Sequence, residues 1–316
     1  MRHIKATLLA FAALTGVAAQ AQPAGPPSVD ESLAPYADAA DAVRLPDGRM
    51  LQFVCMGEGS PTVILTAGLG DFGGVAWSGV QPAMARTTRV CAWDRPGFGL
   101  SDGTASPPTV ATTTADLEAA LAAGTIPGPY VLVGHSLGSY ESLLFADRHP
   151  DQVAGMVLVD PSIPDQTAIL LHLRPDAAAA NDVRDQYVAT LRGCSADVRS
   201  GTLRLGGPDP KNCVAYPPIW PATLREALTA RVIGNPLQYE TIASFVLGVE
   251  DASRLVINPA RDYRDMPLLV LTATVPSPPR PDATAEQLAA SAAWEAEWNR
   301  AHDELAALSS LSLIHI

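Results

Sequence analysis

The chain has 316 residues, of which 47% are hydrophobic, so it can bury one sizeable core. Its formal net charge of −12 at pH 7 argues against nucleic acid as a partner, because phosphates require a basic protein surface.

The first 21 residues have the pattern of a secretory signal peptide. Arg2 and Lys5 precede an apolar stretch over 6–18, and Ala19-Gln20-Ala21 fits the small-x-small cleavage rule. The stretch is shorter than the ~20 residues that a membrane span needs. We therefore expect cleavage after Ala21, a secreted or periplasmic protein and no membrane span in the mature chain. The mature chain, with 19 basic and 33 acidic residues, then carries −14, and residues 22–41 form a leader.

Alternating short apolar runs and helix-like segments follow the leader. The helices expected from the pattern are Asp116–Ala123, Ser139–Arg148 and Thr284–Leu308, the last beginning with a Thr284/Gln287 capping box. The last four of these apolar runs, from Val90–Trp93 to Leu268–Leu271, lack polar alternation, as strands buried on both faces do. The pattern predicts an α/β protein with a mostly parallel central sheet flanked by helices. The expected strands are Met50–Cys55, Val63–Thr66, Val90–Trp93, Tyr130–Val133, Met156–Val159 and Leu268–Leu271.

About a hundred Ala- and Pro-rich residues interrupt this rhythm before the last apolar run. Helix-like stretches at Asp182–Leu191 and Pro221–Arg231 suggest a mainly helical insertion. Because the sheet pattern resumes afterwards, we interpret the insertion as a lid rather than a separate domain. The predicted core therefore comprises residues 42–162 and 266–310, with a lid insertion at 163–265.

All four cysteines lie after the signal peptide, where disulfides can persist. Cys194 and Cys213 bracket a loop rich in Gly, Pro and Asp, whereas Cys55 and Cys91 fall in two strand-like runs. Two disulfides are expected, since no CxxC or histidine cluster suggests a metal. Four cysteines allow three pairings, and the sequence does not choose among them.

The pentapeptide Gly134-His135-Ser136-Leu137-Gly138 lies between an expected strand and an expected helix. This is the setting in which G-x-S-x-G forms a nucleophile elbow, a sharp turn that exposes a serine hydroxyl. Such a turn strains the serine backbone and requires small neighbours, which the two glycines supply. The pattern indicates a serine nucleophile at Ser136.

Together with this turn, two further segments resemble the α/β-hydrolase superfamily over residues 42–310. They are Ala67-Gly68-Leu69-Gly70 and Asp94-Arg95-Pro96-Gly97-Phe98-Gly99-Leu100-Ser101-Asp102, each following a strand. The resemblance implies a Ser, acid, His triad and acyl transfer through an acyl-enzyme. It also implies an oxyanion hole formed by the backbone N–H groups of Leu69 and Leu137. Arg95 is expected to brace its turn.

The acid of the implied triad has two candidates. Asp160 ends the strand one beyond the nucleophile and is the first choice, although a turn or capping role before Pro161 is the alternative. The more usual family position follows Leu268–Leu271, where no acidic residue occurs until Asp282, the reserve candidate.

The implied histidine base is harder to find. His172 in the lid and His302 on the long helix are expected to be exposed to solvent. His315 follows that helix, but relatives place the base beyond one more strand. Residues 311–316, LSLIHI, are the translation of CTGTCTCTTATACACATC, a transposase adaptor used for sequencing libraries. We interpret them as an adaptor-derived tail and expect the last strand, the catalytic histidine and a closing helix to be missing. The alternative is a natural apolar C-terminal strand.

The sequence therefore predicts an exported serine hydrolase that cleaves a small-molecule ester or related acyl bond. No cofactor and no metal are expected. The alternatives are a non-catalytic binding protein with a hydrolase fold and an inactive fragment that lacks the catalytic histidine.

Overall fold

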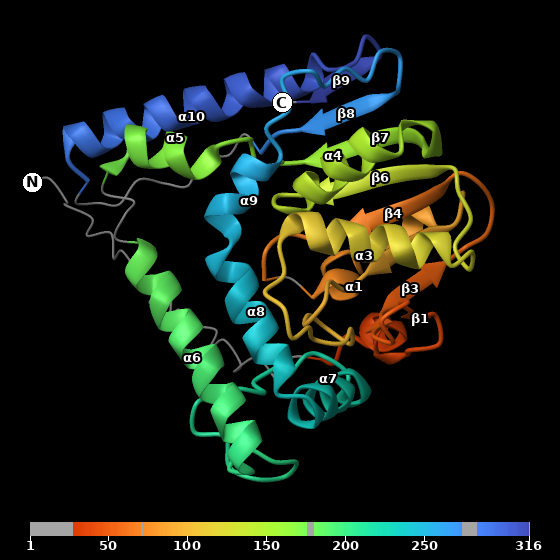
Figure 1. Ribbon diagram of the computed structural model, residues 1–316, viewed down its shortest axis with the longest axis vertical. Coiled ribbons are helices and arrows are strands. Elements are labelled where there is room, and N and C mark those ends of the chain that lie inside the picture. Colours follow the sequence, from red (N-terminus) through yellow and green to blue (C-terminus); the bar gives the residue numbers. More distant parts are fainter. Residues whose placement is uncertain (1–27, 71, 176–179, 274–282, 316) are drawn as a thin grey trace, which may run out of the picture.

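The computed structural model describes residues 28–70, 72–175, 180–273 and 283–315. Within these ranges a seven-stranded sheet has the order β3-β5-β4-β6-β7-β8-β9 (Figure 1). All neighbouring strands are parallel except β3 and β5. The strands are β3 (Phe53–Met56), β4 (Thr62–Thr66), β5 (Val90–Trp93), β6 (Tyr130–His135), β7 (Val153–Val159), β8 (Leu268–Leu271) and β9 (Ser312–His315). The predicted mostly parallel sheet is confirmed.

The first predicted strand is divided at Gln52. Met50–Leu51 forms β2, which pairs with β1 (Val43–Arg44), whereas β3 pairs with β5. The Gln52 backbone N–H donates instead to the Ser101 hydroxyl at 2.8 Å, and its side-chain amide donates to the carbonyl of Phe53. The expected continuous strand is therefore wrong at this residue.

Successive side chains of the inner strands face two different apolar layers. On one face, residues such as Ile64, Leu132 and Met156 pack with side chains of α3 (Val110–Ala122), α4 (Gly138–Arg148) and α10 (Ala285–Ala306). On the other face, residues such as Val63, Leu65 and Val133 pack near α1 (Gly73–Ala76) and α2 (Gln81–Met84). Burial on both faces explains why these strands show no polar alternation.

The two long core helices begin at side-chain caps. Thr109 and Thr112 form a capping box, so α3 starts six residues before the predicted start. The predicted Thr284/Gln287 box is confirmed at α10. Trp294, Trp298 and Leu305 on α10 pack against the core. Short 3-10 helices occupy Glu31–Ala37 and Pro150–Gln152.

The expected absence of a further strand after β8 is not met. Ser312–His315 forms β9, which extends the sheet in parallel beside β8, with Leu271 paired to His315. A strand at this position is what the alternative interpretation of the tail expects.

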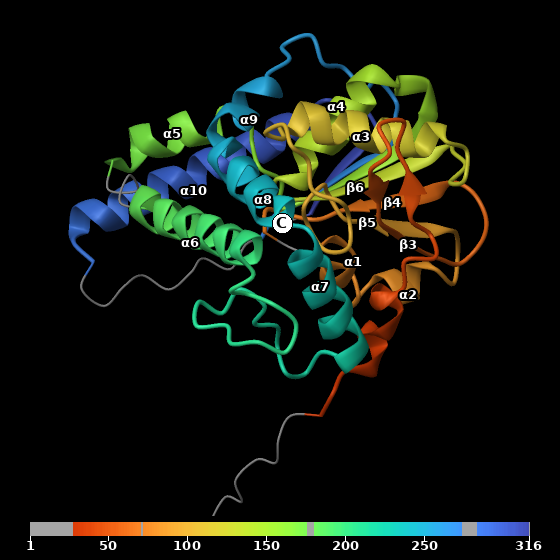
Figure 2. The same cartoon turned by 60° about the horizontal axis from the view of Figure 1, so that its bottom comes forward.

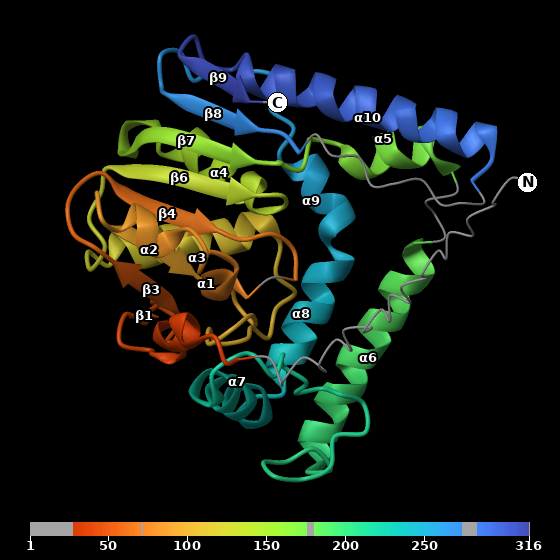
Figure 3. The same cartoon turned by 180° about the vertical axis from the view of Figure 1, so that it is seen from behind.

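The insertion forms a helical layer beside the carboxyl ends of the strands, with α8 and α9 nearest to them (Figures 1 and 3). Helix α6 lies beside α8 (Figure 2). The two helices pack through an apolar cluster that includes Val188, Leu191 and Tyr239. The helices are α5 (Gln166–Leu173), α6 (Ala180–Ser200), α7 (Ala222–Gly234), α8 (Leu237–Leu247) and α9 (Val249–Leu255). None of the helices in the described ranges is long and apolar enough to cross a lipid bilayer.

Polar contacts fix the insertion to the core. Arg231 of α7 donates to the carbonyl of Leu100 at 2.8 Å and forms an ion pair with Asp102. The buried Gln238 of α8 donates to the carbonyl of Ser101 at 2.9 Å. Both contacts therefore attach the insertion to the turn that follows β5.

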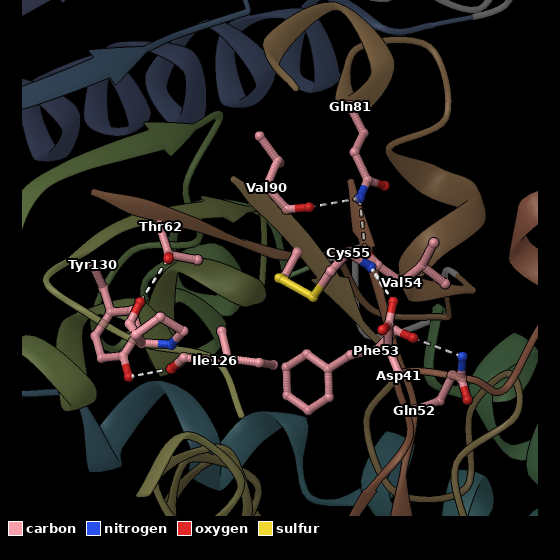
Figure 4. The surroundings of a disulfide bond; sticks show 12 residues. Asp41, Gln52, Phe53, Val54, Cys55, Thr62, Gln81, Val90, Ile126 and Tyr130 are labelled. Atoms are coloured by element: carbon pink, nitrogen blue, oxygen red, sulfur yellow. Dashed lines mark hydrogen bonds between the residues drawn. A yellow bond between two sulfur atoms is a disulfide. The ribbon is translucent and has the colours of Figure 1, made fainter. Parts of the chain in front are cut away.

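All four cysteines lie in the described residues and form two disulfides. Cys55 and Cys91 are directly opposite in the β3–β5 register and are joined. Beside them, Gln81 donates to the carbonyls of Val54 and Val90 (Figure 4). Cys194 on α6 is joined to Cys213 in the following loop.

Removing the second bridge should destabilise the insertion. The bridge closes a segment with a sequence separation of 19 residues, and a loop of that length contributes about 3 kcal/mol by restricting the unfolded chain. We expect Cys194→Ser/Cys213→Ser to lower the unfolding free energy in urea by about this amount. An unfolding free energy equal to that of the unchanged protein would contradict the prediction.

Candidate active site

Ser136 occupies a sharp turn between β6 and α4. Its φ is 49°, in the left-handed region that costs a non-glycine residue about 1–2 kcal/mol. Its N–H donates to the carbonyl of Val159 at 3.0 Å, and its carbonyl accepts from the N–H groups of Ser139 and Ser162, both at 3.0 Å. Such strain persists only where surrounding contacts over-determine it. The strand–turn–helix setting expected from the sequence is present.

The two glycines of the pentapeptide allow this turn to pack closely. A Cβ atom at Gly134 would lie 2.6 Å from the carbonyl oxygen of Gly138. A Cβ atom at Gly138 would lie 2.7 Å from the carbonyl oxygen of Ala67, and closer still to that of Thr66. The start of α4 therefore rests directly on the end of β4, and no side chain fits between them.

Asp160 follows β7 in a second left-handed turn, with φ 43°. Its N–H donates to the carbonyl of Leu271, and its Oδ1 accepts from the N–H of Ala273 at 3.1 Å and from Trp298 Nε1 at 3.2 Å. The carboxylate thus bridges β8 and α10. This geometry fits both the triad acid and the bracing alternative. Asp282, the reserve acid, lies outside the described residues, as does the signal peptide over residues 1–21.

The sheet register aligns these turns. His135, Val159, Leu271 and His315 are successive partners across β6, β7, β8 and β9. Ser136 and Asp160 each follow a member of this row. The strained serine and the carboxylate therefore emerge from neighbouring strands at one edge of the sheet.

The expected oxyanion loop lies at the same edge, after β4. Leu69 is 38% exposed, whereas Leu137, which precedes α4, is 3% exposed. The guanidinium of Arg95 donates to the carbonyls of Ala67 and Gly68 at 2.6 and 2.9 Å. Arg95 therefore braces this loop as well as its own turn.

The expectation that His302 is exposed to solvent is wrong. Its side chain is fully buried, with Nδ1 2.9 Å from the Thr272 hydroxyl and Nε2 2.9 Å from the carbonyl oxygen of Pro161. A carbonyl only accepts, so Nε2 carries the proton and Nδ1 accepts from Thr272. Burial lowers the pKa of His302, so the ring is neutral near pH 7. His172, by contrast, is exposed as expected.

The sequence did contain a signal for the burial of His302. It lies four residues after Trp298 and three before the core residue Leu305, which is the spacing of one helix face. In the structure the ring centroid of Trp298 is 4.7 Å from that of His302.

Asp94 is buried in the turn after β5. Its carboxylate accepts from the N–H groups of Gly74 and Leu100 at 3.1 and 2.9 Å. Burial raises its pKa to about 6, although these donors and the nearby Arg231 act in the opposite direction. These contacts are those of a turn brace. In the described parts of the chain, no group of three or more potential metal ligands is present.

Residues 61–192 match a family model described as the alpha/beta hydrolase fold. An uncharacterized protein of Schizosaccharomyces pombe is 48% identical over 81 residues, covering 26% of this chain and 15% of that protein. RutD of Yersinia enterocolitica, a candidate carbamate hydrolase by name, is 34% identical over 131 residues, covering 40% and 47%. The chain thus matches less than half the length of either relative.

Among solved structures, a thermophilic esterase from Thermogutta terrifontis shares the fold. The superposition has a TM-score of 0.50 with 18% sequence identity and covers 86% of this chain and 87% of the esterase. At this identity the likeness concerns the fold.

Substituting Gly138 should disturb the turn. Gly138→Ala places a Cβ atom against backbone carbonyls, which cannot move as a flexible side chain can. We expect a loss of about 3 kcal/mol in unfolding free energy, measured by urea denaturation. Gly79→Ala is the control, because a Cβ atom there meets no atom within 4 Å. Equal stability of both variants would refute this packing.

Asp94 should make stability depend on pH. Its folded pKa of about 6 exceeds the ordinary aspartate pKa of 3.8, so the folded protein binds the extra proton between these values. Its stabilising contribution is therefore present at low pH and is lost as pH rises through about 6. Relative to the unchanged protein, Asp94→Asn should gain up to about 3 kcal/mol between pH 4 and pH 7. A stability difference that stays constant over this range would contradict the assignment.

Proposed function

Because this chain belongs to the α/β-hydrolase superfamily, we propose that it is an exported serine hydrolase that cleaves a carboxylic ester or related acyl bond. The observation that carries the proposal is the left-handed Ser136 turn at the sheet edge, packed against the loop after β4. Strained residues of this kind cluster at functional sites, where they aim a reactive group.

In the proposed reaction the Ser136 hydroxyl attacks the acyl carbon. A base accepts the hydroxyl proton, and the carbonyl oxygen becomes an oxyanion that the N–H groups of Leu69 and Leu137 stabilise. Collapse of this intermediate expels the alcohol, which receives the proton, and leaves an acyl group on Ser136. Water then attacks the acyl-enzyme by the same route and releases the acid.

Asp160 is the proposed acid of this site. Its N–H and carboxylate contacts hold it rigidly beside the serine turn, which suits a group that orients an imidazole. The superfamily resemblance implies that the base is a histidine reaching this edge.

The insertion supports an apolar substrate group. Phe245 of α8 and Ala252 of α9 belong to the same buried cluster as Leu137, which adjoins the serine. Partly buried Ile242 packs on this cluster. Side chains of this kind beside a nucleophile favour a hydrophobic acyl or alcohol portion.

Two features support export. The sequence pattern of residues 1–21 is that of a secretory signal. The two disulfides are the kind of bond that persists in oxidising compartments.

A second candidate function, a non-catalytic binding protein, is favoured by His302. Both ring nitrogens of His302 are engaged by Thr272 and Pro161 in the described geometry, and burial keeps the ring neutral. In this arrangement His302 is not poised to accept the serine proton.

Fluorophosphonate labelling of the protein expressed from its genomic gene separates the two candidates. The serine hydrolase should be labelled, Ser136→Ala should lose the label, and Asp160→Asn should lose about 10⁴ in ester turnover. Ser106→Ala, which removes an exposed hydroxyl, serves as the control and should be labelled normally. A folded but unlabelled protein would favour the binding protein, and labelling that survives Ser136→Ala would place the nucleophile elsewhere.

A further inference from the structure

A buried ion pair joins the two sides of the proposed oxyanion hole. Arg95 follows β5 and is 3% exposed, and Glu141 lies in the first turn of α4 and is fully buried. Arg95 Nε donates to Glu141 Oε1 at 2.6 Å, and Nη2 donates to Glu141 Oε2. The Thr113 hydroxyl on α3 donates to Oε1 at 2.7 Å, so both charged groups are held in place.

The remaining donors of Arg95 reach the loop after β4. Nη2 donates to the carbonyl of Ala67, and Nη1 donates to that of Gly68. Among the described residues the cis peptide bonds precede Pro61 and Pro129, so the Gly68–Leu69 bond is trans. In a planar trans peptide the C=O and the next N–H point in opposite directions. Fixing the Gly68 carbonyl toward Arg95 therefore directs the Leu69 N–H away from Arg95.

Glu141 connects Arg95 to the helix that follows Leu137, whose N–H is the second proposed oxyanion donor. It lies four residues after Leu137, hence one helical turn along, and α4 rests on the end of β4 at Gly138. Arg95 therefore contacts both elements: its bidentate contact with Glu141 holds α4, and its Nη1 holds the Gly68 carbonyl. An arginine suits this task because its planar fork offers several donors in fixed directions, which a lysine cannot.

The insertion covers this pair. The Phe245 ring centroid on α8 is 5.7 Å from the Arg95 guanidinium carbon, and Phe245 also contacts the ring of Phe98 edge-on. This cover keeps water from the charges and strengthens their hydrogen bonds. The lid helix is thus coupled to the loop through Arg95.

We infer that Arg95 and Glu141 are positioning residues for the reaction, which orient the Leu69 N–H toward the developing oxyanion. The inference rests on the proposed function and assigns the pair a task that turn bracing alone does not include. It requires that loss of the pair slow the chemical step while leaving substrate binding intact, since an oxyanion donor acts on the transition state.

The test compares Arg95→Lys and the paired variant Arg95→Met/Glu141→Leu with the unchanged protein. The paired variant removes both charges, which cores often tolerate well, so it guards against a simple failure to fold. Both variants should lower kcat, and the rate of fluorophosphonate labelling, about 10–100-fold, with KM changed by less than about twofold. Arg261→Lys is the matched control, because Arg261 is buried to a similar extent as Arg95 and pairs with Asp147 near the far end of α4.

A second measurement does not depend on catalysis. NMR relaxation should show the order parameter of the Leu69 N–H falling from about 0.85 to below about 0.6 in the paired variant. An unchanged order parameter, or an unchanged labelling rate in a folded variant, would overturn the inference. If the order parameter falls but the unchanged protein is never labelled, the proposed function fails and the structural part of the inference stands.

Discussion

The close approach of α4 to the end of β4 is the constraint on which the site depends. No side chain fits at Gly138, because the carbonyls of Thr66 and Ala67 occupy the space of its Cβ atom. The chain can reach this position from β6 only through a tight turn. The backbone strain of that turn lies at Ser136, which adopts a left-handed conformation. The buried Arg95–Glu141 pair also connects α4 to the loop after β4. Together these contacts place a hydroxyl, a backbone loop and a helix start within one small region.

The second half of the edge is built by α10 and the turn after β7. Asp160 accepts from Trp298, and the next carbonyl, that of Pro161, accepts from His302. Ser162 then donates to the carbonyl of Ser136. A continuous chain of contacts therefore runs from α10 to the serine turn. His302 is a buried, neutral member of this series of contacts, so it has a structural role in this geometry.

The buried strands and the serine turn could be predicted from the sequence. Continuous apolar runs identified the buried strands, and small residues around Ser136 identified the turn, because both effects depend on neighbours in the chain. Contacts between distant residues could not be read in that way. The division of the first strand depends on Gln52 meeting Ser101, and the ion pair joins residues 46 positions apart. The burial of His302 depends on Thr272 and Pro161, which only the folded sheet brings to α10. The strand formed by Ser312–His315 likewise depends on its pairing with β8.

The central claim is that the strained turn aims the Ser136 hydroxyl at an acyl carbon whose oxygen faces the two backbone donors. A crystal structure of the fluorophosphonate-treated protein tests it most directly. The account predicts phosphorus bonded to Ser136 Oγ, with the phosphoryl oxygen within about 3.1 Å of the Leu69 and Leu137 nitrogens. An adduct on another residue, or a phosphoryl oxygen that faces away from both amides, would contradict the account.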